Sequence, residues 1–172
     1  PDLPVVQVFD RIYASPVPVI RIDDHQVAEL AVSQLASMGH RRIAHIAGSA
    51  DQASARDRRE GYRAAMIRLG LPADDHLIKN GHGTRDGGAE AMRQLLELPQ
   101  APTAVFCGSD TMACAAMDLC RDRGIHVPGD ISFIGADGTA DGQHVYPSLT
   151  TVNIPRADAG IRARDVDRGE RR

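Results

Sequence analysis

The stretch TAVFCGSDTMACAAM at residues 103–117 predicts a buried strand followed directly by a helix. Residues 103–108 form a short apolar run, which is typical of a strand that is buried on both faces. Ser109 or Asp110 then provides an N-cap, and the helix is expected to end at Gly124. Its inward positions follow helical spacing: Met112, Ala113, Ala116, Leu119 and Cys120. A strand followed by a helix is the repeating unit of a parallel sheet.

The same alternation continues on both sides of this stretch. Further strand-like runs occur at 4–9, 17–22, 42–48, 131–135 and 149–154. Segments with helical periodicity lie between most of them, at 27–38, 55–69 and 86–98. The sequence therefore predicts an α/β fold in which helices flank a parallel sheet.

Composition excludes several classes of protein. The chain has 172 residues and a net charge of −3, so it shows no electrostatic tendency to bind nucleic acid by itself. No apolar run approaches the roughly 18–20 residues of a membrane helix, and no membrane partner is expected. Cys107, Cys114 and Cys120 form no CxxC motif, so we expect buried thiols in a reducing cytoplasm and neither a metal site nor a cofactor.

Polar side chains follow five of the predicted strands: Asp10-Arg11, Asp23-Asp24, Ser49, Ser109-Asp110 and Asp137. The carboxyl ends of parallel strands share one edge of a sheet, which is where such folds bind ligands. Carboxylates accept hydrogen bonds from hydroxyl groups, and Arg donates them in a planar fork. The set therefore favours a small polyhydroxyl ligand such as a sugar, although any single member can instead be a helix cap.

Signatures of enzymes are mostly missing. The run GHGTRDGG at 81–88 differs from GxGxxG by one position and does not directly follow a clear strand. The sequence contains no P-loop, GxSxG or HExxH motif, and it pairs no nucleophile with a base at a recognisable spacing. His25, His40 and His45 favour a structural interpretation. No enzymatic activity is predicted, and a nucleotide-dependent α/β enzyme is the minor alternative.

Five ordered motifs together resemble the LacI/GalR family of bacterial transcription regulators. Besides residues 103–117 they are MGHRRIAHIAG at 38–48, RREGYRAAM at 58–66, VPGDISFIGAD at 127–137 and YPSLTTV at 146–152. The resemblance covers residues 4–155 and concerns the effector-binding region, which is shaped like a periplasmic sugar-binding protein. It implies two lobes with the effector in the cleft between them.

The resemblance also implies an organisation into three segments. Residues 1–39 are expected to be a remnant of an incomplete N-terminal lobe, and residues 40–153 the C-terminal lobe. Residues 154–172 are expected to be a crossover and a truncated or disordered tail.

The family's partners follow from the same resemblance. It implies a cytoplasmic repressor that forms a homodimer, or self-associates in another way, and senses a small sugar or polyol. Operator DNA would be bound only through a helix-turn-helix domain absent from this chain, and the effector would change its affinity. A periplasmic-type sugar receptor of a transport system, which shares the fold, is the alternative function.

Two strong candidates for effector contacts come from this resemblance. Arg58 matches the Arg that clamps the effector, and Asp137 matches the effector-binding carboxylate at its strand end. Ser109 stands where many relatives have Asn, so it could still donate and accept hydrogen bonds, but with a shorter reach. Gly83 and Ile154 depart from the family, because many relatives have an aromatic near the first position and Gln at the second. Without a stacking ring, a purine effector is less expected.

Weaker roles are implied for four other residues. Asp10 and Arg11 match a pair that supplies polar contacts from the other lobe in sugar-binding relatives. Asp24 is a further candidate contact, although this position can instead serve only to fix the crossover. Asp110 is expected to cap the helix that follows it.

Overall fold

The computed structural model describes residues 5–8 and 17–155. The chain divides into two compact units, one formed by residues 1–23 and 154–172 and the other by Asp24–Asn153. In the first unit, strands β1 (Gln7–Val8) and β2 (Val19–Ile20) pair in parallel. The predictions for Asp10, Arg11 and the tail beyond residue 155 lie outside the described residues.

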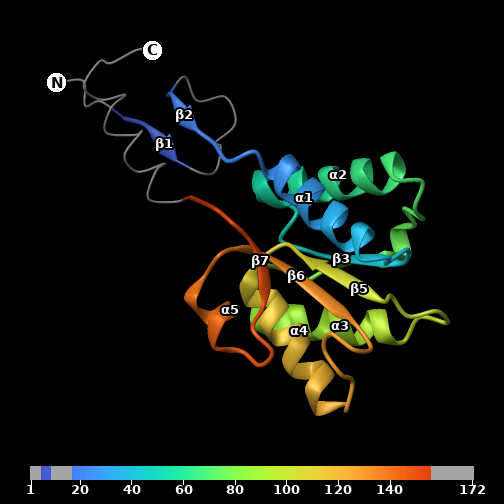
Figure 1. Cartoon of the computed structure of the whole chain (residues 1–172). Helices are drawn as coiled ribbons and strands as arrows, with labels where there is room; N and C mark the ends of the chain where they lie inside the picture. The colour runs from blue at the N-terminus through green and yellow to red at the C-terminus, as the bar shows by residue number, and fades with distance from the viewer. Residues whose placement is uncertain (1–4, 9–16, 156–172) are drawn as a thin grey trace. The chain divides into compact units, whose positions relative to one another are not determined.

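The second unit is built on a parallel sheet of five strands (Figure 1). Their order across the sheet is β4-β3-β5-β6-β7, and every neighbouring pair is parallel. The strands are β3 (Ile43–Ala47), β4 (Ile78–Asn80), β5 (Ala104–Cys107), β6 (Ser132–Asp137) and β7 (Thr150–Asn153). The predicted fold class, a parallel sheet flanked by helices, is confirmed.

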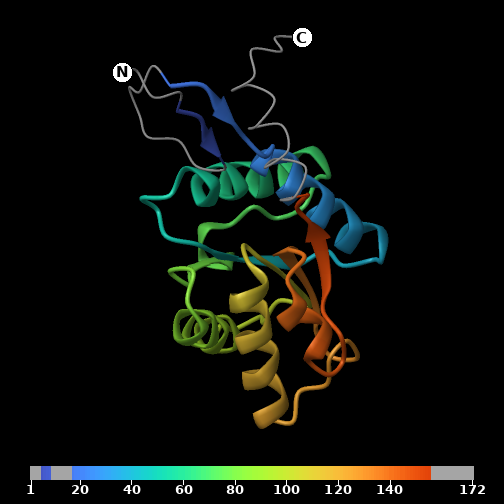
Figure 2. The same ribbon diagram turned by 90° about the vertical axis from the view of Figure 1, so that its left-hand side faces the viewer.

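Helices cover both faces of this sheet (Figures 1 and 2). One face is covered by α1 (Asp24–Ser37) and α2 (Ala53–Arg68), and the other by α3 (Arg85–Leu96) and α4 (Asp110–Asp122). The short helix α5 (Ala140–His144) and the 3₁₀ turn η1 (Asp75–Leu77) complete the unit. Within the described residues, no helix combines the length and the apolar character that crossing a membrane requires.

Neighbouring residues of β3 show how the two faces differ. Ala44 and Ile46 belong to the apolar core with α3 and α4. His45, between them, is fully buried on the opposite face, where its ring stacks between Tyr62 of α2 and Phe106 of β5. Alternate side chains of a strand point to opposite faces of the sheet. Strand β3 therefore contributes apolar side chains to the layer of α3 and α4 and a polar ring to the layer of α1 and α2.

The first boundary of the main unit differs from the predicted one. We expected the C-terminal lobe to begin at residue 40, but the unit begins at Asp24 because helix α1 belongs to it. This helix packs against α2 and against strands of the sheet, and it buries an apolar stripe formed by Val27, Ala28, Ala31, Val32 and Leu35. Leaving that stripe outside the unit would expose it to water.

The loop GHGTRDGG was also misjudged, because strand β4 ends directly before it at Asn80. Its glycines serve close packing. A Cβ on Gly87 would lie 2.1 Å from the carbonyl oxygen of Gly81, and one on Gly88 would lie 2.6 Å from that of Met112 in α4. The loop thus lets α3 approach its neighbours, which accounts for these two glycines without a nucleotide.

Candidate functional site

Arg58 lies in α2 and is the centre of a buried polar cluster. Only 9% of the residue is exposed. Its Nε donates a hydrogen bond to Oδ1 of Asp24 at 2.7 Å, and its Nη1 donates to the carbonyl oxygen of Gly108 at 2.5 Å. Nη1 also approaches Oδ1 of Asp137 at 3.3 Å. One guanidinium therefore joins the start of α1, the end of β5 and the end of β6.

The two carboxylates of this cluster lie where chain elements begin or end. Asp24 is the first residue of α1 and is almost fully buried. Asp137 is the last residue of β6, and its φ of 113° is in the left-handed region that side chains rarely adopt. Backbone strain of this kind is concentrated at functional sites. The structure thus brings together three of the predicted contact residues, Arg58, Asp24 and Asp137.

Such a cluster is not explained by stability. Removing charged groups from water costs several kcal/mol for each ion, and their mutual attraction often fails to offset this cost. Apart from His45, the buried side chains of α1, α2 and β3 are mostly apolar, so the guanidinium and its carboxylate partners are a feature that an ordinary core would lack. Buried charges at the carboxyl ends of parallel strands favour a ligand site.

The structure distinguishes the roles of Ser109 and Asp110 at the start of α4. Ser109 is the N-cap of α4, since its Oγ accepts a hydrogen bond from the backbone N–H of Met112 at 3.3 Å. The prediction that Asp110 caps this helix is therefore wrong. Asp110 is the first helical residue, and its buried carboxylate instead accepts hydrogen bonds from Thr139 and Thr151. A cap must have extended backbone, which Ser109 adopts with φ −158° and ψ 157°.

The sequence analysis missed this role of Asp110 and the pairing of Asp24 with Arg58. No local pattern indicates either, because the partners are 29 to 41 and 34 positions apart in the chain. The signal that was available is the position of Asp24, Asp110 and Thr139 directly after or near strand ends, which topology brings together.

His45 and Cys107 are buried in the sheet, and neither is suited to acid–base or nucleophilic catalysis. Burial lowers the pKa of His45 to about 4, so the ring is neutral near pH 7, and its Nδ1 donates to the carbonyl oxygen of Phe106 at 3.0 Å. Burial also raises the pKa of the Cys107 thiol, which keeps it protonated and unreactive. Within the described part of the chain, no group of His, Cys, Asp and Glu could hold a metal ion.

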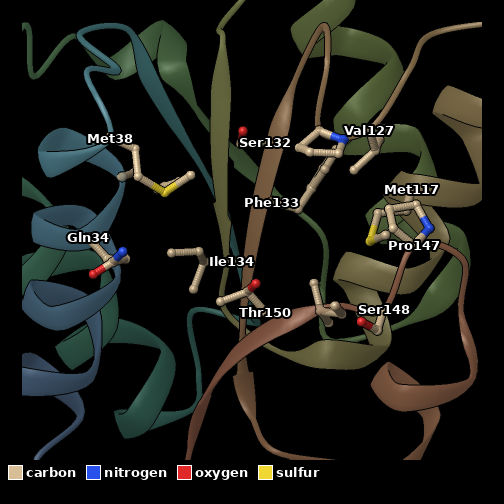
Figure 3. Close-up of a pocket in the computed structure, with 13 residues that line it drawn as sticks. Gln34, Met38, Met117, Val127, Ser132, Phe133, Ile134, Pro147, Ser148 and Thr150 are labelled. Atoms are coloured by element: carbon tan, nitrogen blue, oxygen red, sulfur yellow. The ribbon is translucent and has the colours of Figure 1, made fainter.

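A separate pocket of about 370 Å³ lies elsewhere in the same unit (Figure 3). It is lined by the beginning of β6, from Ser132 to Ile134, together with Met38, which directly follows α1, and Met117 of α4. Asp137 and Arg58 do not line it. Because Asp137 lies at the opposite end of β6, this pocket is not the charged cluster, and its mostly apolar walls offer little to a hydroxylated ligand.

The charged cluster itself can bind but offers no evident reaction. Nε and Nη1 of Arg58 are occupied by protein acceptors, and no hydrogen bond among the described residues involves Nη2. The two N–H groups of Nη2 are thus available to a ligand oxygen, and the Asp137 carboxylate can accept from a hydroxyl. Donors and acceptors held side by side suit a neutral polyol.

Comparison with known proteins identifies the family to which the chain belongs. A family profile described as "Periplasmic binding protein-like domain" matches residues 32–165. The HTH-type transcriptional repressor CytR of Escherichia coli K12 is 42% identical over 146 residues, which are 85% of this chain and 43% of CytR. The chain belongs to the LacI/GalR family.

Solved structures of LacI/GalR regulators agree with this assignment. A LacI family regulator from Mycobacterium smegmatis superposes with a TM-score of 0.90 at 31% identity, over 99% of this chain and 64% of that one. The complex of the regulator CelR with cellobiose gives 0.86 at 35% identity, over 97% of this chain and 53% of that one. The chain thus represents the periplasmic-binding-protein-like, effector-binding part of the family, and it spans less than half the length of CytR.

Proposed function

We propose that this chain is the effector-sensing domain of a LacI-type transcriptional repressor and binds a small sugar through Arg58 and Asp137. The observation that carries the proposal is the arrangement of Arg58. Its Nε and Nη1 are fixed by Asp24 and the Gly108 carbonyl, which leaves Nη2 for the ligand beside the Asp137 carboxylate. A donor held in this way loses little conformational entropy when a ligand binds.

Two further observations support a sugar. The solved relative CelR is described as a complex with cellobiose. In this chain the cluster contains one cation and two carboxylates, which disfavours a strongly anionic ligand and suits hydroxyl groups. Ser109, Asp10 and Arg11 are proposed as additional contacts, the last two from the part of the chain outside the described residues.

The proposed mechanism is differential binding without a chemical reaction. The sugar binds in a cleft between two lobes, stabilises one arrangement of them, and so changes the affinity of the whole regulator for its operator. DNA is contacted by a helix-turn-helix domain outside this chain, in a cytoplasmic homodimer. The relatives CytR and GalR are described as a transcriptional repressor and a transcriptional regulator, which favours this proposal over a transport receptor with the same fold.

Isothermal titration of the chain with a panel of sugars tests the proposal. The panel contains cellobiose, common pentoses and hexoses, their phosphates, and nucleosides as competitors. We expect saturable binding of a neutral sugar, with nucleosides and sugar phosphates binding at least tenfold more weakly.

Arg58→Lys is the most informative variant in this titration. It keeps a positive charge opposite buried Asp24, so the fold should survive, but it removes the guanidinium fork. We expect the affinity for the bound sugar to fall by at least tenfold, or about 1.4 kcal/mol. Arg68 is an exposed Arg of the same helix and pairs with Glu29. Arg68→Gln is therefore the matched control and should change the sugar affinity less than twofold. Equal affinities of Arg58→Lys and wild type would refute the proposed site.

A further inference from the structure

Asp110 is a buried carboxylate whose hydrogen-bond partners are all neutral. The residue is fully buried at the first position of α4. Its Oδ2 accepts from the backbone N–H of Thr139 at 2.6 Å and from the Thr139 hydroxyl at 3.0 Å, and its Oδ1 accepts from the Thr151 hydroxyl at 2.6 Å. No ion pair among the described residues includes Asp110. The start of α4 and these three donors therefore stabilise its charge.

The donors lie on both sides of the segment that presents Asp137. Thr139 follows Asp137 by two residues, and Thr151 lies in β7, where it pairs with Gly135, two residues before the end of β6. The Thr151 hydroxyl also accepts from the backbone N–H of Gly138, at 3.3 Å. Asp110 thus holds Thr139 directly, and Gly138 through Thr151.

The backbone of this segment needs such support. Asp137 and Gly138 have φ values of 113° and 68°, so two consecutive residues adopt positive φ. Conformations of this kind persist only where the surroundings enforce them. The close approach of Asp110 is itself enabled by glycine, since a Cβ on Gly135 of β6 would lie 2.3 Å from Oδ1 of Asp110.

We propose that Asp110 is a positioning residue, which fixes residues 137–139 so that the Asp137 carboxylate faces Arg58. Asp110 does not touch the sugar in this account and acts only through Asp137. The inference rests on the proposed function for its effect on sugar binding, whereas the fixing of the loop can be measured without any sugar.

The first experiment measures amide hydrogen exchange in the peptide covering residues 136–142 of the full chain. Asp110→Asn keeps the shape of the side chain but leaves one acceptor oxygen in place of two. We expect exchange in this peptide to accelerate at least fivefold, with little change in peptides of β3 and α2. Asp118→Asn is the matched control, because Asp118 lies in the same helix, partly exposed, and pairs with Arg85 and Arg121.

The second experiment is a double-mutant cycle on cellobiose affinity, measured by titration, with Asp110→Asn, Asp137→Asn and the combination. Alone, Asp110→Asn should weaken binding at least fivefold. In the Asp137→Asn background, Asp110→Asn should weaken cellobiose binding less than twofold, because the effect of Asp110 passes through Asp137. A residue that merely stabilises the fold would lower affinity equally in both backgrounds. If Asp110→Asn does not fold, Thr151→Val replaces it in both experiments, because it removes one hydrogen-bond donor to Asp110 at nearly constant volume.

The outcomes separate the two claims. Unchanged exchange at 136–142 in Asp110→Asn or Thr151→Val, or additive effects in the cycle, would overturn the positioning role. If wild-type chain binds neither cellobiose nor any other sugar of the panel, the proposed function fails, and the exchange comparison alone decides whether Asp110 holds this segment.

Discussion

The two faces of the sheet bury different kinds of side chains. The face covered by α3 and α4 is an apolar core of aliphatic, thioether, thiol and aromatic side chains, and Asp110, which is buried at its edge, has only neutral hydrogen-bond partners. The face covered by α1 and α2 is also well packed, but it buries Asp24, Arg58 and His45. The two faces therefore differ in the buried ion pair of Arg58 and Asp24, which lies on the face covered by α1 and α2.

The largest expected effect comes from breaking the buried ion pair. Arg58→Ala leaves Asp24 buried and charged without its guanidinium, which should cost about 3–5 kcal/mol of unfolding free energy. Urea unfolding followed by circular dichroism measures this loss. The combined Arg58→Met and Asp24→Leu variant removes both charges and should recover a large part of it. If the double variant is as unstable as Arg58→Ala, the cost does not come from an uncompensated charge.

A cavity in the apolar face should lower stability without affecting binding. Leu95 of α3 is fully buried in the core, so Leu95→Ala should cost about 2–5 kcal/mol. Sugar affinity, measured at a temperature where the variant remains folded, should stay within about twofold. A large loss of affinity would show that the two faces are coupled more strongly than this comparison assumes.

The stability of the folded chain should depend on pH through His45, which is buried on the face covered by α1 and α2. Burial depresses its pKa from 6.5 to about 4 in the folded chain, so the unfolded chain binds more protons between these values. His45 therefore contributes stability fully above pH 6.5, and up to about 3 kcal/mol of it is lost as the pH falls to 4.

The variant His45→Asn isolates this contribution. Its amide can still donate to the Phe106 carbonyl, but it does not titrate. Urea unfolding of wild type and variant between pH 4 and 7 should show a steeper decline in wild type. Parallel profiles would contradict a neutral, buried His45.

The smallest effect is expected on the outer surface of α3. Arg93 pairs with Glu90 and Glu97, and together with Gln94 it lowers the pKa of Glu90 to about 2. These side chains are exposed and screened by solvent, so Arg93→Ala should leave the urea midpoint and the sugar affinity unchanged within error. A clear loss of either would mean that this surface contributes to the fold or the site.

Much of the fold could be predicted because its strands are short apolar runs. The strands around residues 43–47, 104–107, 132–137 and 150–153 and the four long helices were all anticipated. The edge strand β4 was missed because Ile78-Lys79-Asn80 is three residues long with only one buried side chain. Helix α1 was assigned to the wrong unit because periodicity identifies a helix without showing which surface it packs against.

The site could be predicted only in part. Arg58 and Asp137 were identified through the family motifs, and Asp24 as a strand-end carboxylate. The sequence could not show that Asp24 fixes Arg58, since their contact joins two helices through tertiary packing. Ser109 and Asp110 were confused because both favour helix N-termini, and only backbone conformation and hydrogen bonds distinguish them.

The most direct test of the central claim observes Arg58 itself while sugar is added. The Nε–H resonance of Arg58 is followed by ¹⁵N nuclear magnetic resonance during titration with cellobiose and the other sugars, with the Nε–H of Arg68 as an internal control. A saturable shift at Arg58, with no shift at Arg68, is the predicted result for the sugar that binds. Saturable binding that leaves Arg58 unmoved and instead shifts the methyl groups of Met38 and Met117, which line the apolar pocket, would contradict the assignment of the site.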